Sequence, residues 1–177
     1  MTLPAVNLRS LLFFVAAALL TSCAASKKGT SHAYMTKQYK ELKKVLNEAD
    51  VSILNDSLKV IFPNNVMFAT NSDQLKDEIK PTFGRFAEVL NKFDKTKILV
   101  TGYTDNTGTD QINNDLSEKR AVSGKNQLTA SGVAGDRLFT WGLGSRHPIA
   151  TNDSEDGRSK NRRIEFVILY DVKPESK

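Results

Sequence analysis

One run of the chain passes from strand to turn to helix: Lys97-Ile98-Leu99-Val100-Thr101-Gly102-Tyr103-Thr104-Asp105-Asn106-Thr107-Gly108, followed by Asn113-Asn114-Asp115-Leu116-Ser117-Glu118-Lys119-Arg120-Ala121. Its apolar and β-branched beginning predicts a buried strand that ends near Tyr103. Asp, Asn, Thr and Gly then break the strand, and a helical pattern resumes at Asn113. We therefore expect Asp105 at the point where a buried strand emerges, which is the edge where ligands of open α/β sheets bind.

The spacing also predicts which side chains share that edge with Asp105. At about 3.6 residues per turn, Asn113, Leu116 or Ser117, and Arg120 lie on one side of the helix and can face the same opening. A carboxylate accepts hydrogen bonds from an ammonium, and the planar guanidinium of Arg matches a carboxylate with two parallel hydrogen bonds. Spacing alone leaves two interpretations open: a site that grips a zwitterion, or an Asp105 that only pairs with Arg120 or caps its own loop.

Further motifs follow in order along the chain. They are Gly142-x-Gly144 with Pro148-Ile149-Ala150, and Gly157-Arg158-x-x-Asn161-Arg162-Arg163-Ile164-Glu165. Together with Gly102-Tyr103-Thr104-Asp105-Asn106-Thr107-Gly108 and Asn113-x-x-Leu116-Ser117-x-x-Arg120-Ala121, they resemble the OmpA-like peptidoglycan-binding domain over residues 58–169. That family includes the carboxyl-terminal module of outer membrane protein A and the peptidoglycan-associated lipoprotein.

The resemblance implies an α/β (α+β) fold in two layers, a β-α-β-α-β-β domain whose helices pack on a mixed sheet. It also implies that Asp105 and Arg120 hold the amino and carboxylate groups of the diaminopimelate side chain of the wall peptide. The residues implied to line the same pocket are Thr104, Asn113, Leu116 and Arg162. Two positions depart from the family. Ala69 stands where many relatives have an acid near the pocket, and Gly124 replaces a usual aliphatic residue, which close approach of another backbone would explain.

The composition suits one globular domain with appendages, since 40% of the 177 residues are hydrophobic and 25% are charged. The net charge is +5, but the basic residues are interleaved with 20 acidic ones and no nucleic-acid-binding motif accompanies them. The basic excess therefore indicates a solvated surface rather than a nucleic-acid partner. His32 and His147 are isolated and there is one cysteine, so no disulfide within the chain, metal site or cofactor is expected.

The amino-terminal residues have the pattern of a lipoprotein signal peptide. Arg9 precedes an apolar run over residues 11–20, about half the roughly 20 residues that a membrane-spanning helix needs. Leu20-Thr21-Ser22-Cys23 resembles the bacterial lipobox, which implies that Cys23 is acylated with fatty acids such as palmitate and becomes the first mature residue. Ala24 follows instead of Asp, which in organisms of the resembling family favours the outer membrane, with the domain in the periplasm.

These patterns divide the chain into a signal peptide (residues 1–22), a lipidated cysteine and flexible tether (23–33), an amphipathic helix and hairpin (34–57), the OmpA-like domain (58–172) and a tail (173–177). Helices are expected over residues 34–50, 77–93 and 113–130, and strands over 51–54, 58–62, 97–103, 138–142 and 162–170. Residues 62–72 resemble the first strand of the family and its following loop, and residues 145–160 predict a long polar loop. The first helix either docks on the domain or spaces it from the lipid, or it binds a separate partner.

Two functions from different classes remain. One is a non-catalytic tether, with lipid in the outer membrane at one end and peptidoglycan held at the other. The alternative is a scaffold that keeps the fold but binds periplasmic or outer-membrane proteins, with Asp105 and Arg120 merely paired. An enzyme is not indicated, because the sequence has no Gly-x-Ser-x-Gly elbow, metal-ligand spacing or Gly-rich phosphate loop. A glycosidase pair of Asp105 with Asp115 would need a deep sugar cleft that nothing in the sequence predicts.

Overall fold

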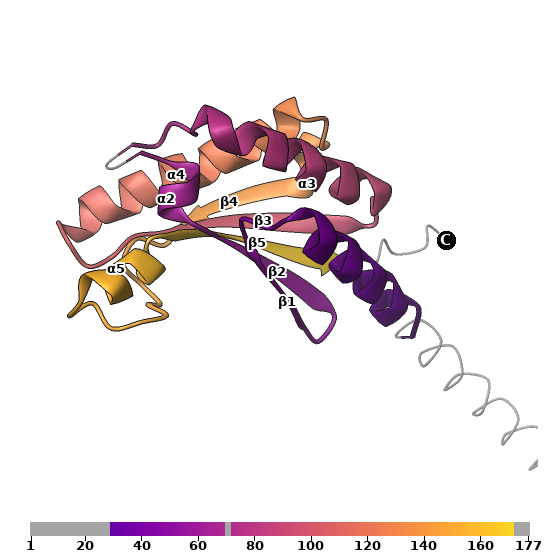
Figure 1. Cartoon of the computed structure of the whole chain (residues 1–177), viewed down its shortest axis with the longest axis horizontal. Helices are drawn as coiled ribbons and strands as arrows, with labels where there is room; N and C mark the ends of the chain where they lie inside the picture. Colours follow the sequence, from indigo (N-terminus) through magenta and orange to yellow (C-terminus); the bar gives the residue numbers. More distant parts are fainter. Residues whose placement is uncertain (1–28, 70–71, 172–177) are drawn as a thin grey trace, which may run out of the picture.

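The computed structural model describes residues 29–69 and 72–171, so Cys23, the predicted signal peptide and the predicted tail lie outside the described residues. The strands within these ranges are β1 (Asp50–Leu54), β2 (Ser57–Pro63), β3 (Thr96–Tyr103), β4 (Leu138–Gly142) and β5 (Arg163–Tyr170). The helices are one over residues 29–45, α2 (Asn64–Met67), α3 (Lys80–Lys92), α4 (Asp110–Ala130) and α5 (Glu155–Asn161), with short 3-10 helices η1 (Asp77–Ile79) and η2 (Gly135–Arg137). Figure 1 shows their arrangement.

The strands form one mixed sheet in the order β1-β2-β5-β3-β4. β3 and β4 are parallel and joined by α4, whereas the other neighbouring pairs are antiparallel. β1 and β2 form the predicted hairpin, whose turn places Asn55 at a φ of 55°, a left-handed conformation that Asn tolerates. The order β2, α3, β3, α4, β4, β5 confirms the predicted β-α-β-α-β-β domain with a mixed sheet.

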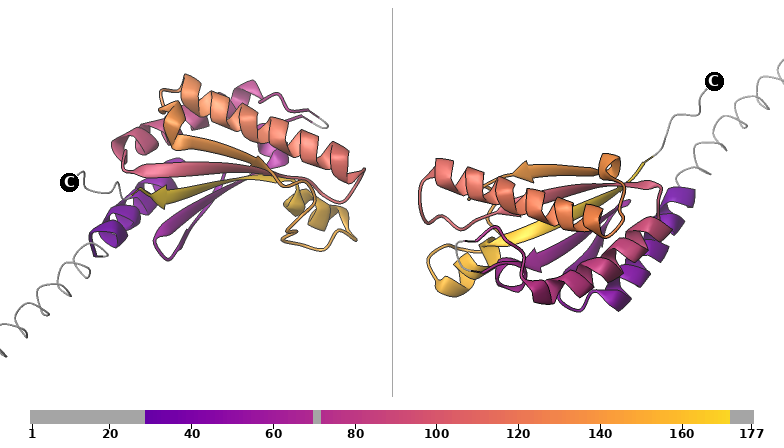
Figure 2. Two further views of the ribbon diagram at one scale, coloured as in Figure 1. Left: turned by 180° about the vertical axis from the view of Figure 1, so that it is seen from behind. Right: turned by 90° about the horizontal axis from the view of Figure 1, so that it is seen from above.

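The long helices pack on one face of the sheet, which gives the predicted two layers. α3, α4 and the helix over residues 29–45 lie side by side on this face (Figure 2). Phe62 of β2, Phe83 and Phe86 of α3, and Phe166 of β5 are fully buried between the layers. Every pair of these rings has its centroids between 5.3 and 6.4 Å apart. A single aromatic cluster therefore joins the helices to the centre of the sheet.

The opposite face of the sheet is more open. Among the described residues no helix lies over its centre (Figure 1). Phe139 and Trp141 of the edge strand β4 and Leu169 of β5 each keep about half of their surface exposed. β5 is an inner strand, as its apolar residues predicted, but only the face that carries Ile168 is fully buried.

The helix over residues 29–45 docks on the domain. Its Met35 and Leu42 are fully buried, and the ring of Tyr34 packs edge-on against that of Phe93 at the end of α3. Its bounds differ from the prediction, since it includes residues 29–33 of the expected tether and ends before residue 50. The early end follows from the hairpin, because residues from Asp50 onward are extended and paired with β2. Within the described ranges, no helix combines the length and apolar character that a membrane span requires.

Two short α-helices were missed by the sequence patterns. The expected loop over residues 145–160 contains the start of α5, where the hydroxyl of Ser154 caps the helix by accepting a hydrogen bond from Gly157 N at 3.1 Å. The expected strand near Phe62 ends at Pro63, and α2 follows at once. Both helices are too short for their periodicity to stand out. The last strand begins at Arg163 because Arg162 is the C-cap of α5.

α4 approaches the ends of β3 and β4 very closely, because glycines there leave room for its backbone. A Cβ at Gly102 would stand 2.0 Å from the carbonyl oxygen of Ser117, and a Cβ at Gly142 would stand 2.6 Å from the backbone nitrogen of Glu118. The surroundings of Gly124, which lies within α4, differ from the close approach of another backbone that we expected. A Cβ there would meet side chains rather than a backbone, with the ring of Phe166 at 3.3 Å.

This difference predicts opposite tolerance at two glycines. Gly102→Ala should destabilise the chain by about 1–3 kcal/mol or more, because the backbone of α4 has to move. Gly124→Ala should stay within about 1 kcal/mol of wild type, since the gain in helix propensity offsets a tight contact with a side chain. Urea unfolding midpoints, compared at equal slopes, measure both changes. Equal destabilisation by the two variants would contradict the close approach at Gly102.

Candidate functional site

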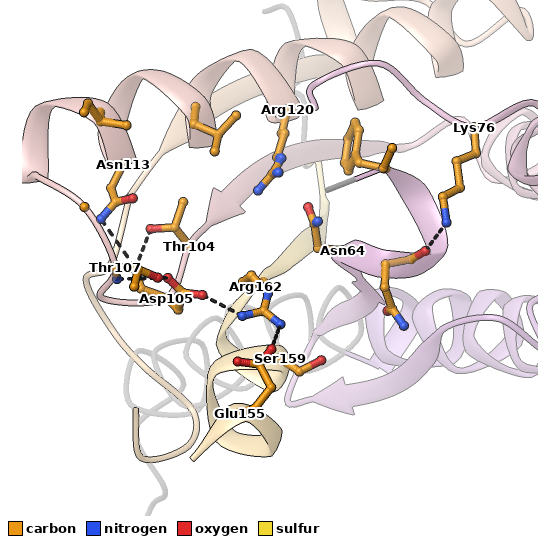
Figure 3. Close-up of a pocket in the computed structure, with 16 residues that line it drawn as sticks. Asn64, Lys76, Thr104, Asp105, Thr107, Asn113, Arg120, Glu155, Ser159 and Arg162 are labelled. Carbon is orange, nitrogen blue, oxygen red and sulfur yellow. Dashed lines mark hydrogen bonds and ion pairs between the residues drawn. The ribbon is translucent and has the colours of Figure 1, made fainter. Parts of the chain in front are cut away.

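A cavity of about 860 Å³ opens where β3 and α4 meet α2 and α5 (Figure 3). Its lining includes all the residues that the sequence assigned to a ligand site: Thr104, Asp105, Asn113, Leu116, Arg120 and Arg162. The charged side chains around it are three cations and two anions, namely Lys76, Arg120, Arg162, Asp105 and Glu155. The excess of positive charge suits a ligand that carries at least one carboxylate.

The carboxyl end of β3 and the first turns of α4 position the predicted residues. β3 ends at Tyr103, so Thr104 and Asp105 emerge at the edge of the sheet, as expected. α4 starts at Asp110, three residues before the predicted helix, because the hydroxyl of Thr109 caps it by accepting a hydrogen bond from Ile112 N at 3.3 Å. Asn113 and Arg120 then lie on the buried side of the helix, with 4% and 3% of their surfaces exposed.

Asp105 is nearly buried, and both of its carboxylate oxygens have partners. Oδ1 accepts a hydrogen bond from Thr107 N at 2.9 Å and another from the Thr107 hydroxyl, and Oδ2 pairs with Arg162 Nη1 at 2.6 Å. Burial raises the pKa of Asp105, but the hydrogen bonds from Thr107 and Arg162 outweigh burial and leave the pKa below its ordinary value. Asp105 is therefore an anion at neutral pH, and it also caps its own loop.

Arg120 is not paired with Asp105 in the structure. Its Nε donates a hydrogen bond to the carbonyl oxygen of Ser72 at 2.9 Å, and its guanidinium carbon lies 5.5 Å from the ring centroid of Phe68. Among the described residues, no hydrogen bond or ion pair engages its two terminal nitrogens. Burial lowers the pKa of Arg120, although the charges of Asp73 and Asp105 oppose that change. Because a guanidinium loses its proton only far above neutral pH, Arg120 still carries its charge there.

Arg162 connects the two sides of the cavity. It pairs with Asp105 through Nη1 and with Glu155 through Nη2. Burial lowers the pKa of Arg162, but the hydrogen bonds to Asp105 and Glu155 raise it by more than burial lowers it. The net shift of this pKa is therefore upward. Because Arg162 is the C-cap of α5, this short helix fixes the guanidinium that holds Asp105 in place.

Sequence reasoning did not assign several polar residues that line the cavity, which are Asn64, Asn65, Lys76, Thr107, Glu155 and Ser159. Glu155 lies in the first turn of α5, and the run Ser154-Glu155-Asp156, a capping residue followed by two acids, is the signal that could have revealed that helix. Asn64 lies at the start of α2 with 7% of its surface exposed, and no pattern in the sequence pointed to it. Ala69, which departs from the family, also lines the cavity and contributes no polar group.

The described part of the chain contains no cluster of three or more His, Cys, Asp or Glu side chains that could bind a metal ion. The polar lining of the cavity supplies fixed charges and hydrogen-bond donors and acceptors. Such a set can hold a small zwitterionic group, with its carboxylate on Arg120 and its ammonium near Asp105.

Known proteins resemble this chain over the same region. A protein named "Probable lipoprotein YiaD" from Escherichia coli (strain K12) is 37% identical over 137 residues, which are 76% of this chain and 63% of that protein. The peptidoglycan-binding protein ArfA of Mycobacterium tuberculosis (strain H37Rv) is 37% identical over 115 residues, which are 65% of this chain and 35% of that protein. The chain thus spans less than two thirds of the length of either relative.

A solved structure and a family model agree with these relatives. The cell wall anchor of the T6SS from Pseudomonas aeruginosa superposes with a TM-score of 0.67 at 30% identity, and the match covers 77% of this chain and 97% of that one. The model described as the OmpA family matches residues 67–162, which include β3, α4 and every predicted pocket residue. The chain therefore belongs to the OmpA family.

Proposed function

We propose that this protein is a non-catalytic peptidoglycan-binding lipoprotein that links the outer membrane to the cell wall. In this role the cavity holds the diaminopimelate side chain of the stem peptide, and acyl chains on Cys23 hold the other end in the membrane. The observation that carries the proposal is the buried Arg120, whose terminal nitrogens have no partner among the described residues and face the same cavity as Asp105. A buried guanidinium is costly unless an anion or acceptor meets it, and a ligand carboxylate supplies one.

The relatives support this proposal from three directions. One is named a lipoprotein, one a peptidoglycan-binding protein and one a cell wall anchor. Each of these names states one of the two properties proposed here, which are a lipid anchor and attachment to the cell wall.

The ion pairs of the cavity explain how Asp105 can serve a ligand while it is already bonded. Arg162 and Thr107 keep its carboxylate ionised and hold it in one orientation. An ammonium that approaches Asp105 then meets a fixed anion rather than a mobile side chain, so little ordering is required on binding. Arg162 stays paired with Glu155 even if its bond to Asp105 lengthens.

We expect Asp105→Ala and Arg120→Ala each to weaken binding to purified sacculi by about tenfold to 150-fold, the value of one charge-assisted hydrogen bond. Co-sedimentation with sacculi measures this loss, and circular dichroism checks that each variant folds. The matched controls are Asp115→Ala and Lys119→Ala, which remove exposed charges of the same sign from the same region outside the cavity. If both cavity variants fold and still sediment like wild type, the scaffold function becomes the better explanation.

The chemistry of the cavity also predicts selectivity between stem peptides. Diaminopimelate carries an ammonium and a carboxylate at the end of its side chain, whereas lysine carries only the ammonium and leaves Arg120 without a partner. A site built to bind a polar group discriminates strongly against an analogue that lacks it. Calorimetry should therefore show tighter binding of diaminopimelate-type than of lysine-type stem peptides, with both weakening as salt rises. Equal affinities for the two peptides would contradict the role of Arg120.

The anchoring part of the proposal concerns Cys23, which lies outside the described residues. Cys23→Ala should release the protein from membranes, because no acyl chain can be attached. Ser22→Ala is the matched control, since it keeps a small residue before the cysteine and should leave the protein in the membrane fraction. Mass spectrometry of the native protein provides the direct measurement, and an unmodified Cys23 or an intact Met1 would overturn the anchor.

A further inference from the structure

One buried polar side-chain atom of the cavity has no hydrogen-bond partner among the described residues. The described residues contain two side chains with such orphaned atoms, Gln38 and Asn64. Gln38 lies in the helix over residues 29–45, away from the cavity, whereas Asn64 lines the cavity with its Oδ1 unbonded. Figure 3 shows the Asn64 side chain between Arg120 and Arg162 at the rim of the same opening. A buried acceptor without a donor disfavours the folded state, so this asparagine needs an explanation.

The fold itself does not require this side chain. The backbone of Asn64 is held without it, because its N–H donates to the carbonyl oxygen of Arg162 at 3.0 Å and its own carbonyl oxygen accepts from Phe68 N at 2.8 Å. The N-cap of α2 is Pro63, and no side chain caps that helix. A hydrophobic residue of similar size would therefore fit the local backbone equally well. Among the described residues, no hydrogen bond of α2 depends on the amide of Asn64.

The missing partner must be a donor, because a carbonyl oxygen only accepts hydrogen bonds. A ligand carboxylate against Oδ1 would place two acceptors face to face, whereas an ammonium brings three N–H donors. Asp105 cannot satisfy all three, since both of its oxygens already accept hydrogen bonds from Thr107 and Arg162. A second acceptor on the rim of the cavity completes the coordination of such a group.

We propose that Asn64 is a ligand-binding residue whose Oδ1 accepts a hydrogen bond from the primary ammonium of the bound diamino acid. The ammonium is then held by two acceptors on different elements, Asp105 after β3 and Asn64 on α2, while Arg120 holds the carboxylate. This inference rests on the proposed function and adds a residue that neither the sequence pattern nor the family motifs had assigned. Asn64 would also supply an acceptor in the cavity, where Ala69 lacks the carboxylate that many relatives have at its position.

The test compares wild type with Asn64→Leu, which keeps the approximate size of the side chain and removes the acceptor. Binding of free meso-diaminopimelate, measured by calorimetry, should fall about tenfold or more, as for one hydrogen bond to a charged group. The melting temperature of the free protein should stay equal or rise, because an unpaired buried acceptor has been removed. A merely structural Asn64 would give the reverse: a lower melting temperature and unchanged affinity.

Pimelate, which has both carboxylates but no amino group, separates the ammonium from the rest of the ligand. Asn64→Leu should leave the affinity for pimelate unchanged, and an equal loss for both ligands would overturn the assignment. Asn64→Ala is the second variant if Leu prevents folding, and Asn47→Leu is the control for the same exchange at an exposed site outside the cavity. Unchanged binding of meso-diaminopimelate by Asn64→Leu overturns this inference alone, whereas a wild type that binds no diaminopimelate overturns the proposed function with it.

Discussion

The contact between the backbone of α4 and the ends of β3 and β4 sets the geometry of everything around the cavity. Gly102 and Gly142 bring this helix closer to the sheet than any side chain would allow. The Ser117 hydroxyl reinforces the contact by accepting a hydrogen bond from Gly144 N at 2.9 Å. Arg120 lies one turn further along the same helix, so its distance from the end of β3 is fixed by packing rather than by a loop.

Much of the fold could be read from local patterns, and the part that could not depends on contacts between distant residues. The hairpin, β3 and α3 have strong periodicity or turn residues, which act within a few positions of the chain. α5 is too short for periodicity and exists because Ser154 caps it and Gly157 fits against the carbonyl oxygen of Thr151. The end of the first helix depends on the pairing of β1 with β2, which begins at Asp50, and no local sequence signal predicts where that pairing begins.

The candidate site likewise has a part that local sequence patterns predicted and a part that they did not. The residue types and spacing around Asp105 and Arg120 indicated a zwitterion site but could not separate it from a simple ion pair, and the resemblance to a family was needed to choose. The structure shows that Asp105 pairs with Arg162 instead, 57 positions away in sequence. Asn64 had no signal at all, because an orphaned acceptor is a property of the folded surroundings and not of a motif.

The direction of the strands has a mechanical consequence. The start of the helix over residues 29–45 lies at one end of the long axis of the domain and α5, beside the cavity, lies at the other (Figure 1). If the protein links a membrane to a wall as proposed, a force between the two would run roughly along β3 and β5, which are paired antiparallel over their full lengths. Pulling along paired strands loads all of their hydrogen bonds together in shear, whereas pulling across them would break one bond after another. Under the proposed function, the hydrogen bonds between β3 and β5 would therefore share the load.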